Sequence, residues 1–250
     1  MIRLFLMVLL VSGCSKAEPP AQAESACREQ RFEGAGFIVC DPRKGELRLF
    51  AAAEGERAIR RFAELPVEPA AVAFAMNAGM FDDDGRPIGL ASSGGKPTHA
   101  VNLRDGPGNF HLKPNGVFIV TAGGAAMIVP SDRIPVFRVA PKLMTQSGPL
   151  LVIDGQLHPK LAHDGSSRYV RNGVGVTADG QALFVISNDA VSLGKFARFF
   201  RDSLRTPYAL FFDGSVSSLW DPANGRMDAF TELGPIIVAF RPAAESAPGP

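Results

Sequence analysis

Two apolar segments of the sequence each end in a polar loop that contains glycine. Residues 72–76 are followed by Asn77, and residues 208–212 are followed by Asp213. A buried strand that presents an amide or a carboxylate at its end holds that group rigidly, which is a common arrangement in active sites. Asn and Asp also start turns through their own side chains, so turn formation is the alternative interpretation at both positions.

Several common catalytic motifs are absent from the sequence. It contains no G-x-S-x-G nucleophile elbow, no P-loop and no H-E-x-x-H zinc motif. Ser93 and Lys96 have the spacing of a serine–lysine pair, but they lie in a glycine-rich loop rather than on a helix, which disfavours a nucleophile there. The scattered positions of the histidines are typical of structural or surface residues: His99, His111, His158 and His163.

The elements that would position Asn77 and Asp213 are mostly strands. Hairpins are predicted where two apolar runs flank a polar or Asp-Gly turn, because Asp-Gly suits the positive dihedral angles of tight turns. The predicted pairs are 37–40 with 47–51, 117–120 with 126–129, 150–153 with 156–157, and 174–177 with 182–186.

Helical spacing of apolar residues is clear in one segment. It predicts a helix over 193–204 with Ser192 as its N-cap, and a shorter helix is predicted over 58–65. We therefore predict a single α+β domain, in which a mixed or antiparallel sheet is covered by two or three helices.

Composition and the N-terminal segment limit the classes of protein to which the chain can belong. The chain has 250 residues and a net charge of +1, so no basic field points to nucleic acid as a partner. Arg3 precedes an apolar run over 4–11 that is too short to cross a bilayer as a mature helix. A basic start, a short apolar stretch and small residues are typical of a secretory signal peptide, which we place at 1–13.

The residues that follow the apolar run resemble the lipobox of bacterial lipoproteins. Val11-Ser12-Gly13-Cys14 has the pattern in which the cysteine receives lipid and becomes the first residue of the mature protein. The resemblance implies a protein lipid-anchored to a membrane of the bacterial cell envelope, at the outer membrane where the cell has one. An ordinary signal peptide with a chance cysteine is the alternative.

The rest of the chain divides into a tether, a domain and a tail. Residues 14–30 are predicted to be the lipidated cysteine and a flexible tether, 31–241 a globular domain, and 242–250 a disordered tail. Export also favours a disulfide between the two remaining cysteines, Cys27 and Cys40, because two thiols in an oxidising compartment usually pair.

Six short motifs, in order along the domain, resemble the phosphodiester glycosidase family. They are NAGMF at 77–81, the glycine loop at 82–90, NGVF at 115–118, SGPL at 147–150, RNGVGV at 171–176 and DGSVSS at 213–218. Two further segments, 106–115 and 167–172, resemble a bacterial branch of that family. Each motif is weak alone, but the ordered set covers nearly all of the domain.

The resemblance implies a hydrolase that cleaves a glycosyl phosphodiester in envelope or extracellular glycan material. A guanidinium offers two parallel donors to phosphate oxygens, and Arg171 is assigned this role, with Arg168 as the second choice. A carboxylate must stabilise the oxocarbenium-like state or activate water, and Asp213 is the candidate. Asn77 completes the predicted catalytic set. The predicted substrate-binding residues are Gly79, Ser147, Gly148, Arg168, Gly214, Ser217 and Ser218.

Departures from the family pattern keep alternatives open. Ala78 and Ser215-Val216 stand where the family has glycines, and fewer glycines allow fewer close backbone contacts with an anion. The alternatives are a metal-assisted phosphodiesterase and a non-catalytic lipoprotein that binds anionic glycans. No cofactor is implied, but a divalent metal bound through Asp213 stays open. The expected partners are a sugar phosphodiester or anionic glycan, and a membrane through the lipid anchor.

Overall fold

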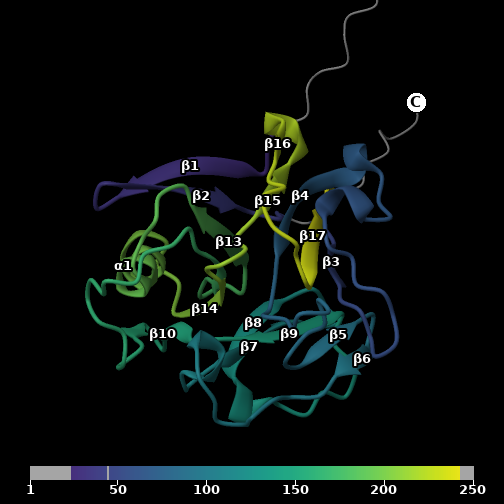
Figure 1. Cartoon of the computed structure of the whole chain (residues 1–250), viewed down its shortest axis with the longest axis horizontal. Coiled ribbons are helices and arrows are strands. Elements are labelled where there is room, and N and C mark those ends of the chain that lie inside the picture. Colours follow the sequence, from purple (N-terminus) through teal and green to yellow (C-terminus); the bar gives the residue numbers. More distant parts are fainter. Residues whose placement is uncertain (1–23, 44, 243–250) are drawn as a thin grey trace, which may run out of the picture.

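The computed structural model describes residues 24–43 and 45–242, which form three antiparallel sheets (Figure 1). The seven-stranded sheet has the order β1 (Cys27–Phe32), β2 (Ala35–Cys40), β13 (Ala182–Ser187), β12 (Asn172–Val176), β14 (Tyr208–Asp213), β10 (Leu150–Ile153) and β11 (Gln156–Leu157). One five-stranded sheet has the order β16 (Arg226–Met227), β15 (Leu219–Asp221), β4 (Val72–Asn77), β17 (Ile236–Phe240) and β3 (Leu47–Phe50). The other has the order β6 (Lys96–His99), β5 (Ala91–Ser93), β9 (Leu143–Ser147), β7 (Gly116–Val120) and β8 (Ala126–Pro130).

The predicted α+β class with two or three covering helices is wrong, because the described chain is mostly β. The described residues contain one α-helix, α1 (Leu193–Arg198), which continues as a π-helical segment, Phe199–Ser203. The remaining helical pieces are single 3-10 turns. Three sheets that pack on one another bury most of the apolar surface among themselves, so one helix is enough to cover the remaining face.

The inner faces of the three sheets share one aromatic cluster. The ring of Phe184 in β13 lies 5.4 Å from Phe74 in β4, 5.6 Å from Phe118 in β7 and 6.4 Å from Phe212 in β14, measured between centroids. All four side chains are fully buried. Edge-on and tilted aromatic pairs add to the energy of burial. The cluster therefore fixes the strands of different sheets relative to one another.

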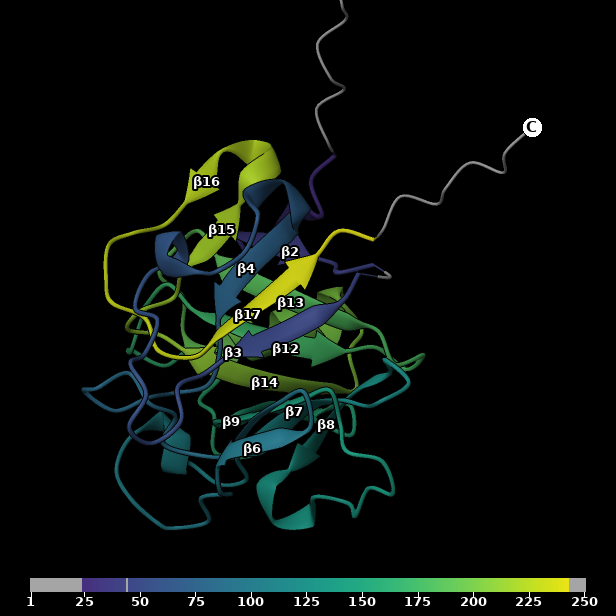
Figure 2. The ribbon, with the colours of Figure 1, turned by 90° about the vertical axis from the view of Figure 1, so that its right-hand side faces the viewer.

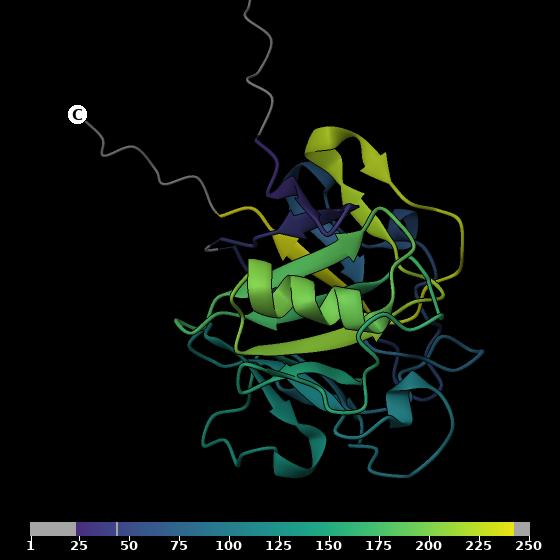
Figure 3. The ribbon, with the colours of Figure 1, turned by 90° about the vertical axis from the view of Figure 1, so that its left-hand side faces the viewer.

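Helix α1 covers the outer face of the seven-stranded sheet (Figure 3). Ser192 is the N-cap, as predicted, because its Oγ accepts a hydrogen bond from the backbone N–H of Lys195 at 3.1 Å. Beneath the helix, the ring of Phe37 stacks on Phe199 at 4.0 Å. The seven-stranded sheet is thus buried on both faces, which explains why its central strands are continuous apolar runs.

Three predicted hairpins form, and one does not. β7 pairs with β8, β10 with β11, and β12 with β13. Asp154 and Gly155 both have positive φ, as the Asp-Gly turn between β10 and β11 requires. The predicted pair 37–40 with 47–51 is wrong. Both edges of β2 are taken by β1 and β13, and β3 instead pairs with β17 in another sheet.

The short helix predicted over 58–65 is also wrong. Only a 3-10 turn, Phe62–Glu64, forms there. A helix of two turns is unstable on its own, and the apolar residues reach the core without it. Phe62 and Leu65 are buried in a cluster that contains Trp220 of β15.

The predicted disulfide between Cys27 and Cys40 is present and joins residues directly opposite each other in β1 and β2. β1 begins at Cys27, so the sheet includes the last residues of the 14–30 segment that was predicted to be a tether. The signal peptide, Cys14 and most of the 242–250 tail lie outside the described residues. No helix in the described ranges is long and apolar enough to cross a membrane.

The two ends of the sheets carry different strand termini. The first residue of β12 and the last residues of β4, β9, β13 and β14 lie at one end of the sheets. The opposite end holds the start of β1 and the end of β17, where Arg241 donates a hydrogen bond to the carbonyl of Glu24. Figure 2 shows both ends of the described chain on the same side of the molecule. The chain therefore enters and leaves the domain away from the strand ends that carry Asn77 and Asp213.

Candidate active site

Side chains from all three sheets meet at one end of the fold. Asn77 ends β4, Asn172 begins β12, Asp213 ends β14 and Ser147 ends β9. Asn172 lies opposite Asp213 in the register of their two strands. Ser147 Oγ donates a hydrogen bond to the carbonyl of Phe212 at 2.8 Å, which ties a strand of the third sheet to the end of β14. Asn77 and Asp213, predicted as separate strand ends, are therefore brought together.

Two buried amides form the centre of this cluster. Nδ2 of Asn172 donates hydrogen bonds to the carbonyl oxygen of Asn77 at 2.7 Å and to its Oδ1 at 2.9 Å. The same Oδ1 of Asn77 accepts a hydrogen bond from the backbone N–H of Ser218 at 2.9 Å. Oδ1 of Asn172 accepts from the backbone N–H of Asp213 and from the hydroxyl of Ser217, both at 3.2 Å. The two amides thus hold both ends of the 213–218 loop.

Asp213 starts the loop through its own side chain. Its Oδ1 accepts hydrogen bonds from the backbone N–H groups of Gly214 at 2.6 Å and Ser215 at 2.7 Å. This is the turn-forming role that Asp often takes. Within the described residues, no group donates to Oδ2, and the side chain is partly exposed. One carboxylate oxygen therefore orders the loop while the other remains available for chemistry.

Arg171 is a buried cation. It is 1% exposed, and its guanidinium donates from Nε to the carbonyl of Val191 at 2.7 Å and from Nη2 to the carbonyl of Ser167 at 2.9 Å. Its guanidinium carbon lies 5.5 Å and 5.4 Å from the ring centroids of Tyr169 and Phe211. Burial lowers the pKa of the Arg171 guanidinium to about 10, and in the described chain no Asp or Glu forms an ion pair with it.

The guanidinium of Arg171 reaches the loop that Asp213 starts. A Cβ atom added to Gly214 would lie 3.1 Å from Nη1 of Arg171 and 3.2 Å from the ring of Phe211. Nη1 makes no hydrogen bond within the described residues, whereas Nε and Nη2 are fully used. A glycine at this position therefore leaves room for one edge of the guanidinium beside the loop.

Three of the predicted site residues lie outside this cluster, and Ser147 belongs to it only through its buried hydrogen bond to Phe212. Ser147 is fully buried, and a Cβ on Gly79 would collide with the backbone of Gln146. A Cβ on Gly148 would lie 2.6 Å from that of Asn115. Arg168 is half-exposed and pairs with Asp164 at 2.8 Å. Ser147 and Gly79 contribute to contacts between sheets, Gly148 packs closely against Asn115, and the structure does not bring the Arg168 guanidinium into the cluster.

Two residues of the cluster were missed as individual candidates. Asn172 appeared only as part of a motif, and Ser187, whose Oγ accepts a hydrogen bond from the backbone N–H of Arg171 at 3.0 Å, did not appear. A signal for Asn172 existed, because it is a polar residue at the start of an apolar strand, as Asn77 is at the end of one. No comparable signal marked Ser187.

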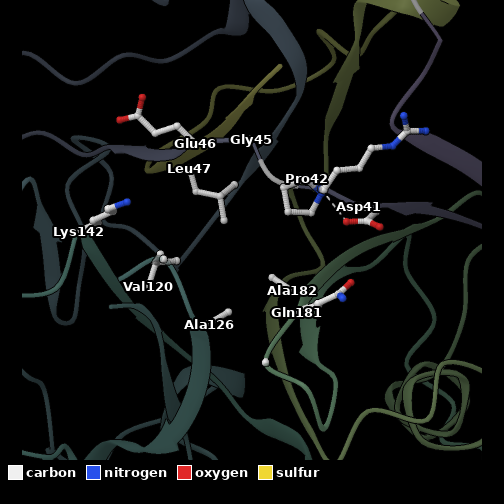
Figure 4. Close-up of a pocket in the computed structure, with 13 residues that line it drawn as sticks. Asp41, Pro42, Gly45, Glu46, Leu47, Val120, Ala126, Lys142, Gln181 and Ala182 are labelled. Carbon is white, nitrogen blue, oxygen red and sulfur yellow. Dashed lines mark hydrogen bonds between the residues drawn. The ribbon is translucent and has the colours of Figure 1, made fainter. Parts of the chain in front are cut away.

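A cavity of about 370 Å³ lies beside the 213–218 loop and is lined by Ser215, Val216, Ser217 and Ser218 together with residues of three other segments. Another cavity, of about 150 Å³, lies at the opposite end of the strands (Figure 4). Its lining includes Leu47, Val120 and Ala182, and it contains none of the predicted site residues. The structure thus places a cavity next to the candidate site.

Residues 24–43 and 45–242 contain no candidate metal-binding cluster. No group of three or more His, Cys, Asp or Glu side chains gathers there closely enough to hold a metal ion. Asp213 and Arg171 are the ionisable residues of the cluster described above.

The sequence matches the profile of a known protein family, and it is similar to one curated protein. Residues 70–229 match phosphodiester glycosidases, a range that includes Asn77, Arg171 and Asp213. The chain is 35% identical over 151 residues to an uncharacterised protein, YigE of Escherichia coli (strain K12). The aligned region covers 60% of this chain and 58% of that protein. The chain thus spans little more than half the length of this relative.

Similarity to solved structures supports the fold, and two of them illustrate it. The catalytic domain of zebrafish N-acetylglucosamine-1-phosphodiester alpha-N-acetylglucosaminidase, auto-inhibited by its pro-peptide, superposes with a TM-score of 0.61 over 87% of this chain and 82% of that chain, at 14% identity. A protein from Burkholderia pseudomallei K96243 gives a TM-score of 0.52 over 83% of this chain and 74% of that chain, at 12% identity.

Proposed function

Because this chain belongs to the phosphodiester glycosidase family, we propose that it hydrolyses a glycosyl phosphodiester, with Arg171 binding the phosphate and Asp213 acting on the sugar. Water supplies a hydroxyl to the anomeric carbon and gives its remaining proton to the carboxylate of Asp213. The bond between that carbon and the phosphate oxygen breaks, and the phosphate monoester leaves with the electron pair. Because phosphate is a weak base, this leaving group needs charge stabilisation more than protonation.

The observation that carries the proposal is the buried guanidinium of Arg171, which has no carboxylate partner in the described chain. A buried charge without an opposite charge is costly, and proteins rarely keep one without a use. A phosphate group would provide the missing negative charge. Nη1 is the donor that faces the 213–218 loop, so the phosphate would sit beside Gly214. Charge on the departing phosphate grows as the bond breaks, so this contact strengthens in the transition state.

Asp213 is the proposed carboxylate on the sugar side. Its Oδ1 is engaged with the backbone of its own loop, so Oδ2 is the oxygen that would face the oxocarbenium-like centre or take a proton from water. The hydrogen bonds that Asn172 Oδ1 accepts from the loop, and the one that Ser217 Oγ donates to the carbonyl of Asp213, keep the loop rigid, which favours a fixed position for the carboxylate. Asn77 acts through this same network, holding the far end of the loop at Ser218.

The proposed setting is the cell envelope. The lipobox-like residues 11–14 support a lipid anchor and a substrate in envelope or extracellular glycan material. The position of the first described residues is compatible with such an anchor. The described chain begins at the end of the sheets opposite to Asn77 and Asp213, so an N-terminal anchor would leave the candidate site unobstructed.

Hydrolysis in water enriched in oxygen-18 tests the reaction. Cleavage at the anomeric carbon places the label in the free sugar, and this is the expected result with a sugar phosphodiester substrate. Label in the phosphate product would show cleavage of the P–O bond and would replace the proposal with a phosphodiesterase. Binding of sugar phosphodiesters without turnover of any would instead identify an anionic-glycan-binding protein.

A further inference from the structure

The cavity of about 370 Å³ beside the 213–218 loop has a mixed lining. Neutral hydrogen-bonding groups line part of it, namely Ser187, Asn188, Ser217 and Ser218, and apolar side chains and one ion pair line other parts. A cavity that offers neutral donors on one side and carbon surface on another suits a ring with both hydroxyl edges and a C–H face.

The charged residues of the cavity neutralise each other. Arg226 donates from Nη2 and Nε to the carboxylate of Asp228 at 2.8 Å and 3.1 Å, and from Nη1 to Oδ1 of Asn188 at 3.3 Å. Asp228 also accepts a hydrogen bond from the backbone N–H of Leu219 at 2.9 Å. The ion pair therefore has no net charge to offer a phosphate. It anchors the segment that follows β16 instead.

An aromatic ring projects at the end of this anchored segment. Phe230 is 91% exposed although it lines the cavity, two residues after Asp228. Val170, adjacent to Arg171 in the sequence, lines the same cavity and is 36% exposed. Single exposed apolar residues are ordinary, but several that border one cavity mark a binding site. Phe230 and Val170 form such an apolar border.

We propose that this cavity binds the sugar ring of the substrate, with the C–H face of the ring against Phe230 and its hydroxyls on Ser217, Ser218 and Asn188. The proposal rests on the proposed hydrolysis of a glycosyl phosphodiester. It places the neutral part of the substrate on one side of the 213–218 loop, next to Val170, and the phosphate at Arg171 on the other. Phe230 is then a specificity residue, without a part in the chemical step.

Steady-state kinetics of Phe230→Ala test the proposal. We expect kcat/KM for a sugar phosphodiester to fall about tenfold, mainly through KM, since an apolar contact with the substrate is lost while the reacting groups are unchanged. Phe230→Trp should restore most of the affinity. The matched control is Val136→Ala. Its side chain is 99% exposed and is far from Phe230 in the sequence, so this variant should have the parental KM. An unchanged KM in Phe230→Ala would overturn the proposal.

A probe without phosphate separates this proposal from the proposed function. Saturation-transfer NMR with the methyl glycosides of glucose, galactose, mannose and N-acetylglucosamine should detect binding of at least one to the parent, and Phe230→Ala should abolish it. If that result appears while no phosphodiester is hydrolysed, the cavity is a sugar site and the proposed reaction is wrong. If phosphodiesters are hydrolysed but no glycoside binds in a Phe230-dependent way, the cavity proposal alone is wrong.

Discussion

Asn77 and Asn172 join two different sheets through their side-chain amides. Nδ2 of Asn172 lies 2.9 Å from Oδ1 of Asn77, and neither residue is more than 1% exposed. Each amide also binds one end of the 213–218 loop, Asn172 at the N–H of Asp213 and Asn77 at the N–H of Ser218. The position of the loop therefore depends on the contact between β4 and β12.

The first prediction concerns this contact. Asn172→Ala leaves the buried donors and acceptors of Asn77 and of the loop unpaired, at a cost of about 1–3 kcal/mol in unfolding free energy. Turnover should fall as well, because the loop loses its anchor. Urea unfolding and steady-state kinetics measure the two effects. Asn109→Ala, at an exposed side chain that makes no hydrogen bond within the described residues, is the control and should change neither. A folded Asn172→Ala variant with full activity would show that the loop needs no such anchor.

Arg171→Lys should weaken phosphate binding. Lysine keeps the positive charge but cannot donate to Val191 and Ser167 while also facing the loop. Inorganic phosphate should raise the Tm of the parent, because a ligand that binds the folded state stabilises it, and it should raise the Tm of Arg171→Lys much less.

Arg168→Lys is the matched control for this substitution, because its exposed guanidinium pairs with Asp164 outside the cluster. It should keep the parental response to phosphate. Equal Tm shifts in parent and Arg171→Lys would mean that phosphate binds elsewhere.

Asp213→Asn should fold like the parent and turn over slowly. The amide oxygen of asparagine can still accept from the N–H groups of Gly214 and Ser215, so the loop keeps its shape. Losing the carboxylate should reduce kcat by about two to four orders of magnitude, the usual scale for an acid–base group. Asp179→Asn, at the opposite end of the strands, should retain parental kcat. Near-parental kcat in folded Asp213→Asn would leave Asp213 only its role in the turn.

His158 should make the fold sensitive to acid. The side chain is 1% exposed, and burial lowers the pKa of its imidazole below the ordinary value of 6.5. The unfolded chain then binds a proton more readily than the folded protein, so unfolding free energy is kept above pH 6.5 and falls as pH drops below it. Thermal melts between pH 8 and pH 5 should show this loss.

His158→Gln should flatten that dependence, because it removes the titrating group. His163→Gln, at an exposed side chain, should leave the slope unchanged. An identical slope in His158→Gln and the parent would assign the acid sensitivity to other groups.

Cys14→Ser should release the protein from membranes with its domain intact. The expectation comes from residues 11–14, which lie outside the described structure. Fractionation after detergent-free lysis measures it. A Cys27→Ser and Cys40→Ser double variant is the control. It should stay membrane-bound but lose stability, by about 3 kcal/mol for a loop of this length. Retention of Cys14→Ser in the membrane fraction would contradict lipid attachment there.

Local signals in the sequence were enough for most strands and for the residues that end them. Continuous apolar runs mark β4 and β14 because both faces of these strands are buried, and Asp-Gly pairs mark two of the hairpins because few other residues accept positive φ. The Cys27–Cys40 bond followed from counting thiols in a chain that was predicted to be exported. These features depend on nearby residues, so a single sequence reveals them.

Tertiary structure alone decided which strands pair and which side chains meet. β2 and β3 are neighbours in the sequence but lie in different sheets, since the competition for partners among the seventeen strands of the described residues is settled by the whole core. The same reason separates the predicted site residues. Asn77, Asn172 and Asp213 share hydrogen bonds across sheets, whereas Ser147 and Gly79 are used in packing and Arg168 faces Asp164. Sequence determined what each strand end carries, and only the closed packing of three sheets determined which of those ends touch.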